Sequence, residues 1–329
     1  MTRSTHETQP EICESEHLQQ DVTLLSAKAR ALTENLTVYR AIPQQQLRMV
    51  GPWCFVDHFG PVATKNYRQF DIAPHPHIGL QTITWLFSGE LKHLDSLGYE
   101  QPLRPGQLNL MTAGNGISHA EVADENLQQP LHGLQLWCAL PQQYEQVAPN
   151  FEHYRELPHF AINDVMAELI LGDYQNYRSP GTTFHPCIAM LLTTPKNAQA
   201  TIKLNKEFEY ALYVVSGSLY LTHPSNANFN QGHGAHEHEL ISLGANRSEL
   251  SLAFGADTRV LLLGGEAFPQ PVTMWWNYVS HNAERIRQAD ADWQQGHARF
   301  GKVAHYQGER LIGPAIPSGL GVSTSNRKS

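Results

Sequence analysis

The sequence predicts an all-β protein built from two tandem β-barrels or sandwiches, followed by one short helix. Short apolar runs of strand length recur through most of the 329 residues and are separated by Gly, Pro, Asn and Asp. β-branched and aromatic residues are common in these runs, and parts of them alternate with a period of two. A short stretch of the first half also resembles one in the second half, which indicates a duplicated module.

The first module is assigned to residues 31–150. Residues 1–30 are polar and weakly patterned, so we expect an N-terminal extension that is partly disordered or helical. The strands of the first module include TITWLFSGELKHLDSLG and LRPGQLNLMTAGNGISHAE. A polar connector at 141–160 marks its end.

The second module is assigned to residues 151–296, where the same style of strand returns in EFEYALYVVSGSLYLT and TRVLLLGGE. An amphipathic pattern from about residue 282 to 294 predicts the short C-terminal helix. Residues 297–329 are assigned to a tail, which we expect to be loose at its end.

The internal repeat is asymmetric in its histidines. TWLFSGELKHL (84–94) aligns with LYVVSGSLYLT (212–222), which places Gly89 on Gly217. In this register His75 and His77 fall on Lys203 and Asn205. The fold is therefore predicted to be duplicated, while the chemistry is kept in the first copy.

Composition excludes some classes of function. Charged residues make up 16% of the chain, below the usual ~25%, and the net charge is −8. This balance argues against direct nucleic-acid contact, which needs a basic face. The four cysteines form no CxxC pair, and we expect reduced thiols. The N-terminus has no apolar signal region and no run approaches ~20 apolar residues, so we expect a cytoplasmic protein without a membrane span.

The stretch APHPHIGLQT contains two histidines, His75 and His77, separated by one proline. Side chains at i and i+2 of a strand point to the same face, so these two imidazoles are expected to project together. If the strand continues, Gln81, Trp85 and Phe87 share that face. Polar side chains would then lie at the opening of the barrel interior, and apolar side chains would lie deeper inside it.

A second pair with the same spacing follows in GISHAE, where His119 and Glu121 are two residues apart. Three imidazoles and one carboxylate suit Fe(II), Mn, Co, Ni, Cu or Zn better than Mg or Ca. A metal with a purely structural role is more often held by a closed Cys/His tetrahedron, so this set favours chemistry.

Other histidines are weaker candidates. The alternative to a metal site is that the HxH pair arose by chance, because the chain has 18 histidines. Pro76 would then mark only the start of a strand. His93 is either a lining residue or, as we favour, a histidine on the surface of a strand. A solvated loop is the favoured interpretation of the Gly- and Asn-rich run that holds His233, His236 and His238. The sequence has no GxSxG, Walker A or HExxH motif.

The sequence resembles the pirin family of the cupin superfamily in several stretches that keep the order of the family. These are RMVGPWCFVDHFGP (48–61), PHPHIGLQTITWLFSGEL (74–91), HLDSLG (93–98), RPGQLNLMTAGNGISHAE (104–121), LHGLQLWCALP (131–141) and LLLGGEAFPQPVTMWWNYV (261–279). The resemblance implies a bicupin, two tandem jelly-roll β-barrels with a metal only in the N-terminal one. It also implies four iron ligands: His75, His77, His119 and Glu121.

The chain departs from many members of that family after PHPH. Those relatives have Arg-Gly-Phe-Glu, whereas this chain has Ile78, Gly79, Leu80 and Gln81. Gln81 keeps the size of the glutamate and loses its charge, which makes the expected cavity less acidic. Gln81 is a candidate to hydrogen-bond a substrate or a bound water, with a satisfied barrel residue as the alternative.

By resemblance to pirins that are similar to quercetinases, we expect a metal-dependent dioxygenase-like protein, with Fe(II) as the metal and quercetin or a related enol aromatic as the substrate. Glu121 would bind the metal and also take the hydroxyl proton. Trp85, Phe87 and Met111 are candidate walls of an aromatic pocket, with plain core as the alternative. The alternative function is a metal-dependent redox-sensing protein that modulates a protein partner; a structural or vestigial metal is the third. A bicupin needs no partner chain to close its two barrels, so the resemblance is compatible with a monomer.

Overall fold

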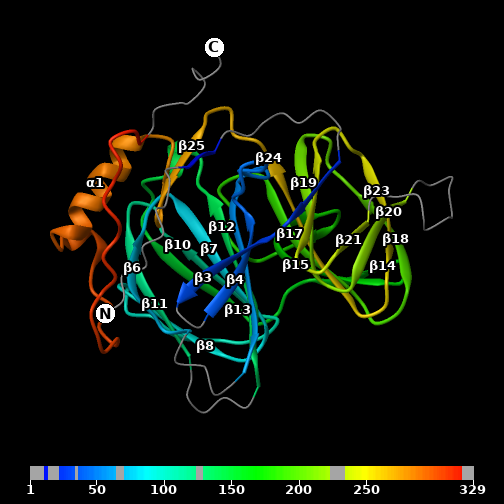
Figure 1. Cartoon of the computed structure of the whole chain (residues 1–329), viewed down its shortest axis with the longest axis horizontal. Coiled ribbons are helices and arrows are strands. Elements are labelled where there is room, and N and C mark those ends of the chain that lie inside the picture. Colours follow the sequence, from blue (N-terminus) through cyan, green and yellow to red (C-terminus); the bar gives the residue numbers. More distant parts are fainter. Residues whose placement is uncertain are drawn as a thin grey trace.

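The computed structural model describes residues 11–13, 22–33, 36–63, 70–123, 129–222 and 234–320. It confirms the all-β class: two barrels lie side by side, and the described residues contain one α-helix, α1 (Ala283–Gln294) (Figure 1). All pairings between named strands are antiparallel.

The first barrel consists of a seven-stranded and a four-stranded sheet. The larger sheet has the order β13-β10-β7-β12-β5-β4-β3, and the smaller one β6-β11-β8-β9. Their bounds are β3 (Lys28–Thr33), β4 (Leu36–Ile42), β5 (Trp53–Val62), β6 (Ile72–His77), β7 (Leu80–Ser88), β8 (Leu91–Asp95), β9 (Glu100–Leu103), β10 (Leu108–Thr112), β11 (Ile117–Ala123), β12 (Leu131–Ala139) and β13 (Asn150–Tyr154).

The second barrel repeats this plan. Its eight-stranded sheet has the order β14-β15-β17-β24-β19-β22-β2, with β16 paired to β15, and its smaller sheet is β18-β23-β20-β21. Their bounds are β2 (Thr23–Ser26), β14 (His159–Ile162), β15 (Val165–Tyr174), β16 (Tyr177–Arg178), β17 (Cys187–Thr194), β18 (Ala198–Lys203), β19 (Phe208–Ser216), β20 (Ser218–Thr222), β21 (Gly234–His236), β22 (Glu239–Gly244), β23 (Glu249–Phe254) and β24 (Thr258–Glu266).

The chain after the second barrel returns to the first one. β25 (Val272–Trp275) and β26 (Tyr278–Ser280) form a small sheet with β1 (Glu11–Cys13). The short 3-10 helices are η2 (Gln142–Tyr144) and η3 (Ala298–Phe300). Helix α1 and the tail behind it lie along the outer side of the first barrel, next to β6 and β11 (Figure 1). The backbone N–H of Leu311 donates to the carbonyl oxygen of Pro74 at 2.8 Å, so the tail is tied to the strand that carries the histidine pair.

One expectation about the ends of the chain is corrected. The N-terminal extension is neither helical nor loose where it is described, because β2 pairs with β22 of the second barrel and β3 with β4 of the first. These few residues therefore link the two barrels. In the tail, Leu320 is buried and its carbonyl accepts a bond from Arg287 Nη2. The expected loose end falls mainly on residues 321–329, which lie outside the described part.

The predicted duplication is confirmed by the backbone. Gly89 follows β7 and Gly217 follows β19, and both have a φ of +80°. A side chain is strained in that left-handed region, which explains why glycine occupies both positions. The two barrels therefore turn from the large to the small sheet in the same way.

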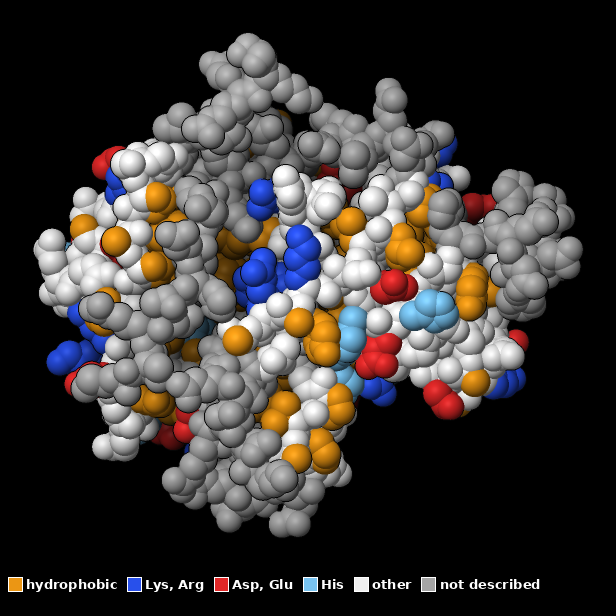
Figure 2. All heavy atoms as spheres, in the orientation of Figure 1, with side chains coloured by type: hydrophobic (Ala, Val, Ile, Leu, Met, Phe, Trp, Pro, Cys, Tyr) orange, Lys and Arg blue, Asp and Glu red, His pale blue; other side chains and the backbone are white. Residues whose placement is uncertain are grey.

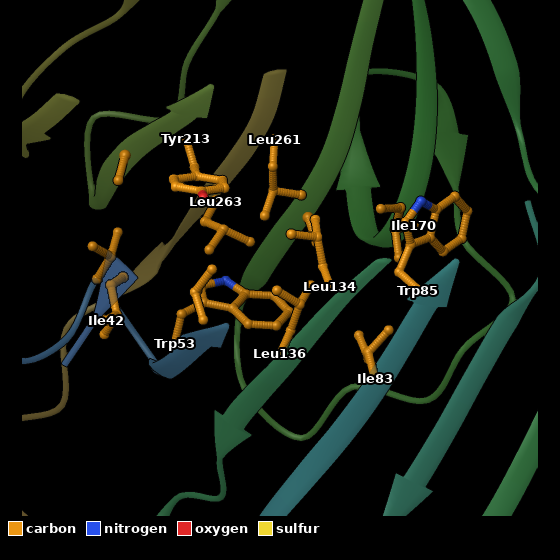
Figure 3. Close-up of a cluster of buried hydrophobic side chains, with 14 of the residues drawn as sticks. Ile42, Trp53, Ile83, Trp85, Leu134, Leu136, Ile170, Tyr213, Leu261 and Leu263 are labelled. Carbon is orange, nitrogen blue, oxygen red and sulfur yellow. The ribbon is translucent and has the colours of Figure 1, made fainter. Parts of the chain in front are cut away.

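The barrels meet through a buried apolar layer that we call the junction cluster (Figure 3). Hydrogen bonds also cross the junction: Trp53 Nε1 donates to the Gly264 carbonyl at 3.0 Å, and the Gly51 N–H to Glu209 Oε2 at 2.8 Å. Each large side chain buried there contributes about 1.5–3 kcal/mol. The cluster includes Trp53, Trp85, Leu134, Leu136, Ile170, Tyr213, Leu261 and Leu263.

The described cysteines are buried: Cys54, Cys138 and Cys187. Cys138 and Cys187 are free thiols, in agreement with the expectation of reduced cysteines. Cys13 lies in β1, but its side chain is outside the described part. Within the described ranges, no helix has both the length and the apolar character needed to cross a membrane.

Three histidines gather where the barrels join. His58 is fully buried, with Nδ1 3.0 Å from the Tyr213 hydroxyl and Nε2 2.6 Å from Nε2 of His132. His238 lies 3.3 Å from the same hydroxyl and stacks on Tyr39. Figure 2 shows histidine side chains beside acidic ones at the surface over this junction.

The predicted solvated loop is therefore wrong for one of its three histidines. His238 is half-buried against Tyr39, whereas His236 is exposed. The third, His233, lies outside the described residues.

These contacts predict a pH-dependent stability. Burial, followed by the neighbouring His132, His238 and Arg259, lowers the pKa of His58 from 6.5 to about 3. The unfolded chain therefore binds more protons than the folded chain below pH 6.5, and stability falls as the pH falls. His58→Gln should reduce the loss of unfolding free energy between pH 7 and pH 5 by about 2 kcal/mol, measured by urea denaturation. The control, His236→Gln, should leave that loss unchanged; an equal loss in His58→Gln and wild type would contradict the account.

Candidate metal centre

The first barrel brings three predicted ligands together. His75 and His77 lie on β6, and antiparallel pairing places His119 of β11 directly opposite His75. One ligand atom from each imidazole lies within 4.8 Å of the other two. The side chains are buried, with exposed fractions of 7% for His75 and 1% for the other two.

A turn directly after the histidine pair is possible because residue 79 is glycine. Gly79 has a φ of +69°, and a Cβ there would lie 2.0 Å from the carbonyl oxygen of Val279. No other residue fits this conformation and this close approach. The chain therefore leaves the small sheet after His77 and enters the large sheet as β7.

Backbone carbonyls set the tautomers of the first two imidazoles. Nδ1 of His75 lies 2.9 Å from the carbonyl oxygen of Ala73, and Nδ1 of His77 lies 3.0 Å from that of Asn277. A carbonyl oxygen only accepts, so each Nδ1 carries the proton and each Nε2 keeps its lone pair. Asn277 lies between β25 and β26, so the returning chain holds a ligand of the first barrel.

One ring nitrogen of His119 has no hydrogen-bond partner among the described residues. This nitrogen, Nε2, is buried. Leaving a buried polar atom unsatisfied costs about 1–3 kcal/mol, and such atoms are rare in folded proteins. A metal ion held by three imidazole nitrogens would satisfy it, so the residues fit a transition metal.

Electrostatics keep the three imidazoles in the state that metals require. Burial lowers the pKa of His75 to about 4 and takes those of His77 and His119 well below their ordinary value. Their mutual proximity lowers the pKa of His77 and of His119 further. All three are neutral at pH 7, and neutral imidazole is the ligand form.

Glu121 is buried nearby, but it is not a member of the histidine group among the described residues. A β-bulge lies between His119 and Glu121, so their regular two-residue alternation is interrupted. Oε1 of Glu121 accepts a hydrogen bond from the Thr84 hydroxyl at 2.5 Å. Burial raises the pKa of this carboxyl group. Its role as a fourth ligand stays a prediction.

The turn at Gly79 overturns the expectation that the histidine face continues along β7. Trp85 and Phe87 belong to the junction cluster, where Trp85 lies beside Ile170 (Figure 3). Gln81 is satisfied by its bonds from Nε2 to Thr112 Oγ1 at 2.9 Å and to the Thr182 carbonyl at 3.0 Å. Trp85 and Phe87 are therefore core residues, and Gln81 is a hydrogen-bonded polar residue of the barrel. These were the alternatives to lining a pocket.

Met111 instead lies in a buried group that we call the first-barrel cluster. This group touches the histidines, because the ring of Trp137 meets His77 edge-on with centroids 5.1 Å apart. Trp137 stacks on Phe55 at 4.0 Å, and its Nε1 has no hydrogen-bond partner in the described part of the chain. The cluster includes Phe55, Phe59, Leu80, Leu86, Met111, Ile117, Trp137 and Phe151.

Sequence reasoning missed Trp137 and His93. A tryptophan in an apolar strand carries no sign that its N–H is unpaired. His93 is not on the surface, as predicted: it is 3% exposed and contacts His119, with their Nδ1 atoms 3.3 Å apart. The HxD spacing of His93 and Asp95 was the available signal, because it matches the spacing of the ligands themselves.

The small sheet of the second barrel is apolar where β18 and β23 pair. Ala200 lies opposite Leu252 in this pair. Ala200, Ile202 and Leu252 are buried in an apolar cluster, whereas Lys203, which the repeat aligned with His75, is exposed. Among the described residues, the one group of histidine, cysteine and carboxylate side chains spaced to hold a metal lies in the first barrel.

We expect His119→Ala or His75→Ala to lower the affinity for Fe(II) more than about 100-fold. Removing a residue that only hydrogen-bonds a metal ligand lowers the affinity about 10–100-fold, and removing the ligand itself should lower it further. Anaerobic titration with a competing chelator measures this, and circular dichroism checks that the barrels remain folded. His236→Ala is the matched control and should bind as wild type does. Unchanged metal content in His75→Ala and His119→Ala would show that the ligand group is wrong.

Comparisons with known proteins agree with this architecture. Residues 35–138 match the family described as Pirin, and residues 189–301 match the Pirin C-terminal cupin domain. A Pseudomonas aeruginosa protein named "Putative quercetin 2,3-dioxygenase PA1205" is 39% identical over 92% of both chains. A pirin-like protein of Caulobacter vibrioides is 33% identical over 82% of this chain and 92% of its own.

The fold is also similar to that of a solved protein. The crystal structure of quercetin 2,3-dioxygenase from Acinetobacter baumannii has a TM-score of 0.84 to this chain. The two are 36% identical, and the match covers 90% of this chain and 96% of the other. With its two cupin domains and these relatives, the chain belongs to the pirin family.

Proposed function

We propose that this chain is a metal-dependent dioxygenase that acts on a flavonol such as quercetin, or on a related enol aromatic. The observation that carries the proposal is the buried, unpartnered Nε2 of His119 beside the neutral His75 and His77. The relatives named as quercetin dioxygenases support the choice of substrate class.

Three imidazoles hold a transition metal and leave other coordination positions open. We propose Fe(II) as the metal; Mn, Co, Ni, Cu and Zn suit the same donors, and metal analysis decides among them. When bound, Fe(II) supplies a Lewis acid that favours the deprotonated 3-hydroxyl of the flavonol and its reaction with O2. The cytoplasmic location and the monomeric state stay predictions.

Glu121 is the proposed fourth ligand and the acceptor of the substrate's hydroxyl proton. Burial raises the pKa of this carboxyl group, which makes it a better proton acceptor than an exposed glutamate. The Thr84 hydroxyl orients one carboxylate oxygen, which leaves the other oxygen for the metal or the proton.

The first-barrel cluster is the proposed wall of the substrate site. Trp137 supplies apolar surface beside His77 and stacks on Phe55, and Met111 belongs to the same cluster. Such a surface suits a flat aromatic ring and excludes water. The unpaired indole N–H of Trp137 is the proposed donor to a substrate oxygen.

The proposal predicts oxygen uptake by the anaerobically iron-loaded protein when quercetin is added. Glu121→Gln should lower this uptake about 10²–10⁴-fold, because the proton acceptor is lost while the side chain keeps its size. His119→Ala should show no uptake. An absence of uptake in wild type with one iron bound would contradict the proposal and favour the redox-sensing regulatory function.

Trp137→Phe should raise KM for quercetin about tenfold, because one hydrogen bond of about 1.5 kcal/mol is lost while the stacking on Phe55 is kept. Steady-state oxygen uptake measures KM, and metal content should not change. Trp275→Phe is the matched control: it removes another buried N–H without a partner, outside the first-barrel cluster. Equal KM values in wild type and Trp137→Phe would exclude the indole as a substrate donor.

A further inference from the structure

We propose that Asp95 and His93 form a hydrogen-bond chain that sets the tautomer of His119 and so makes its Nε2 a metal ligand. The inference rests on the proposed metal site and deepens it. Asp95 and His93 are positioning residues: they touch neither substrate nor metal, and they act through His119.

The chain runs between two neighbouring strands. Oδ2 of Asp95 lies 3.0 Å from Nε2 of His93, and Nδ1 of His93 lies 3.3 Å from Nδ1 of His119. Pairing of β8 with β11 places Asp95 opposite His119. None of the three side chains is more than 3% exposed, so water does not compete for these bonds.

With His93 neutral, the donors and acceptors along this chain allow one arrangement. A carboxylate only accepts, so Nε2 of His93 carries a proton and donates to Asp95. In a neutral imidazole the other nitrogen, Nδ1, then has a lone pair and accepts. The N–H at Nδ1 of His119 donates to this lone pair. His119 is neutral, so its Nε2 carries no proton. That is the buried nitrogen that has no hydrogen-bond partner among the described residues.

Asp95 and His93, which we call the relay, are both held rigidly. The other oxygen of Asp95, Oδ1, accepts the backbone N–H groups of Leu97 at 2.9 Å and Tyr99 at 3.1 Å. The His93 ring stacks on Phe151 with centroids 4.2 Å apart and an interplanar angle of 14°. A rigid relay is what an oriented ligand requires.

His119 differs in this respect from the other two histidines. Nδ1 of His75 and of His77 each face a backbone carbonyl, whose direction no side-chain substitution can reverse. The tautomer of His119 depends on side chains alone, so one isosteric change can invert it.

Asp95→Asn is the inverting change. Leu97 and Tyr99 still need an acceptor, so the amide oxygen faces them and the NH₂ group faces His93. The proton of His93 then moves to Nδ1, and that of His119 moves to Nε2, where it points at the metal position. We expect the affinity for Co(II), measured by chelator competition, to fall about 10–100-fold. The midpoint of thermal unfolding of the metal-free protein checks folding.

A second readout needs no metal. Nitrogen-15 NMR distinguishes the two neutral tautomers of histidine. In metal-free wild type, His119 should carry its proton on Nδ1, and in Asp95→Asn on Nε2. Asp57→Asn, which removes another buried carboxylate, should alter neither the tautomer nor the affinity for Co(II).

His93→Phe completes a double-mutant cycle, because it keeps the stacking on Phe151 and removes both nitrogens. If Asp95 acts through His93, Asp95→Asn should have no further effect in the His93→Phe background. Additive losses, or wild-type affinity and tautomer in Asp95→Asn, would overturn the relay. If wild type binds no Co(II) but His119 shows the Nδ1 proton, the metal function fails and the tautomer chain stands.

Discussion

The site depends on three neutral imidazoles being buried with their Nε2 lone pairs turned toward one point. Burial disfavours the protonated form, so it produces the state that metals bind. It also requires that every ring N–H finds an acceptor. The acceptors come from three places: Ala73 beside the first histidine, Asn277 from the chain that returns after the second barrel, and His93 from the next strand.

This requirement for acceptors is met mostly within the first barrel. One of the three acceptors, the carbonyl of Asn277, comes from the hairpin of β25 and β26, and β26 contacts β6, the strand of the histidine pair. In the second barrel, Ala200, Ile202 and Leu252 belong to a buried apolar cluster, and their side chains need no hydrogen-bond partners. The second barrel packs against the first through the junction cluster, and its strand β22 pairs with β2 of the N-terminal chain.

Much of the fold and site could be predicted because the signals are local. The glycine- and proline-rich breaks between strands and the glycine repeat predicted two barrels. The two-residue spacing in PHPH and HAE marked His75, His77 and His119 as candidate ligands, and the structure then showed that their strands pair. The errors arise where the position of a side chain depends on pairing between strands that are distant in the sequence. The turn at Gly79 sends Trp85 and Phe87 to the junction, a bulge breaks the alternation before Glu121, and the pairing of β8 with β11 buries His93.

The central claim is that three imidazoles of the first barrel bind one metal through Nε2. X-ray absorption at the iron edge of the anaerobically loaded wild-type protein tests it most directly. We expect one iron per chain and the outer-shell scattering of three imidazole rings, with oxygen donors completing the coordination. Scattering from fewer than three imidazoles, or from sulfur ligands, would show that this ligand set is wrong.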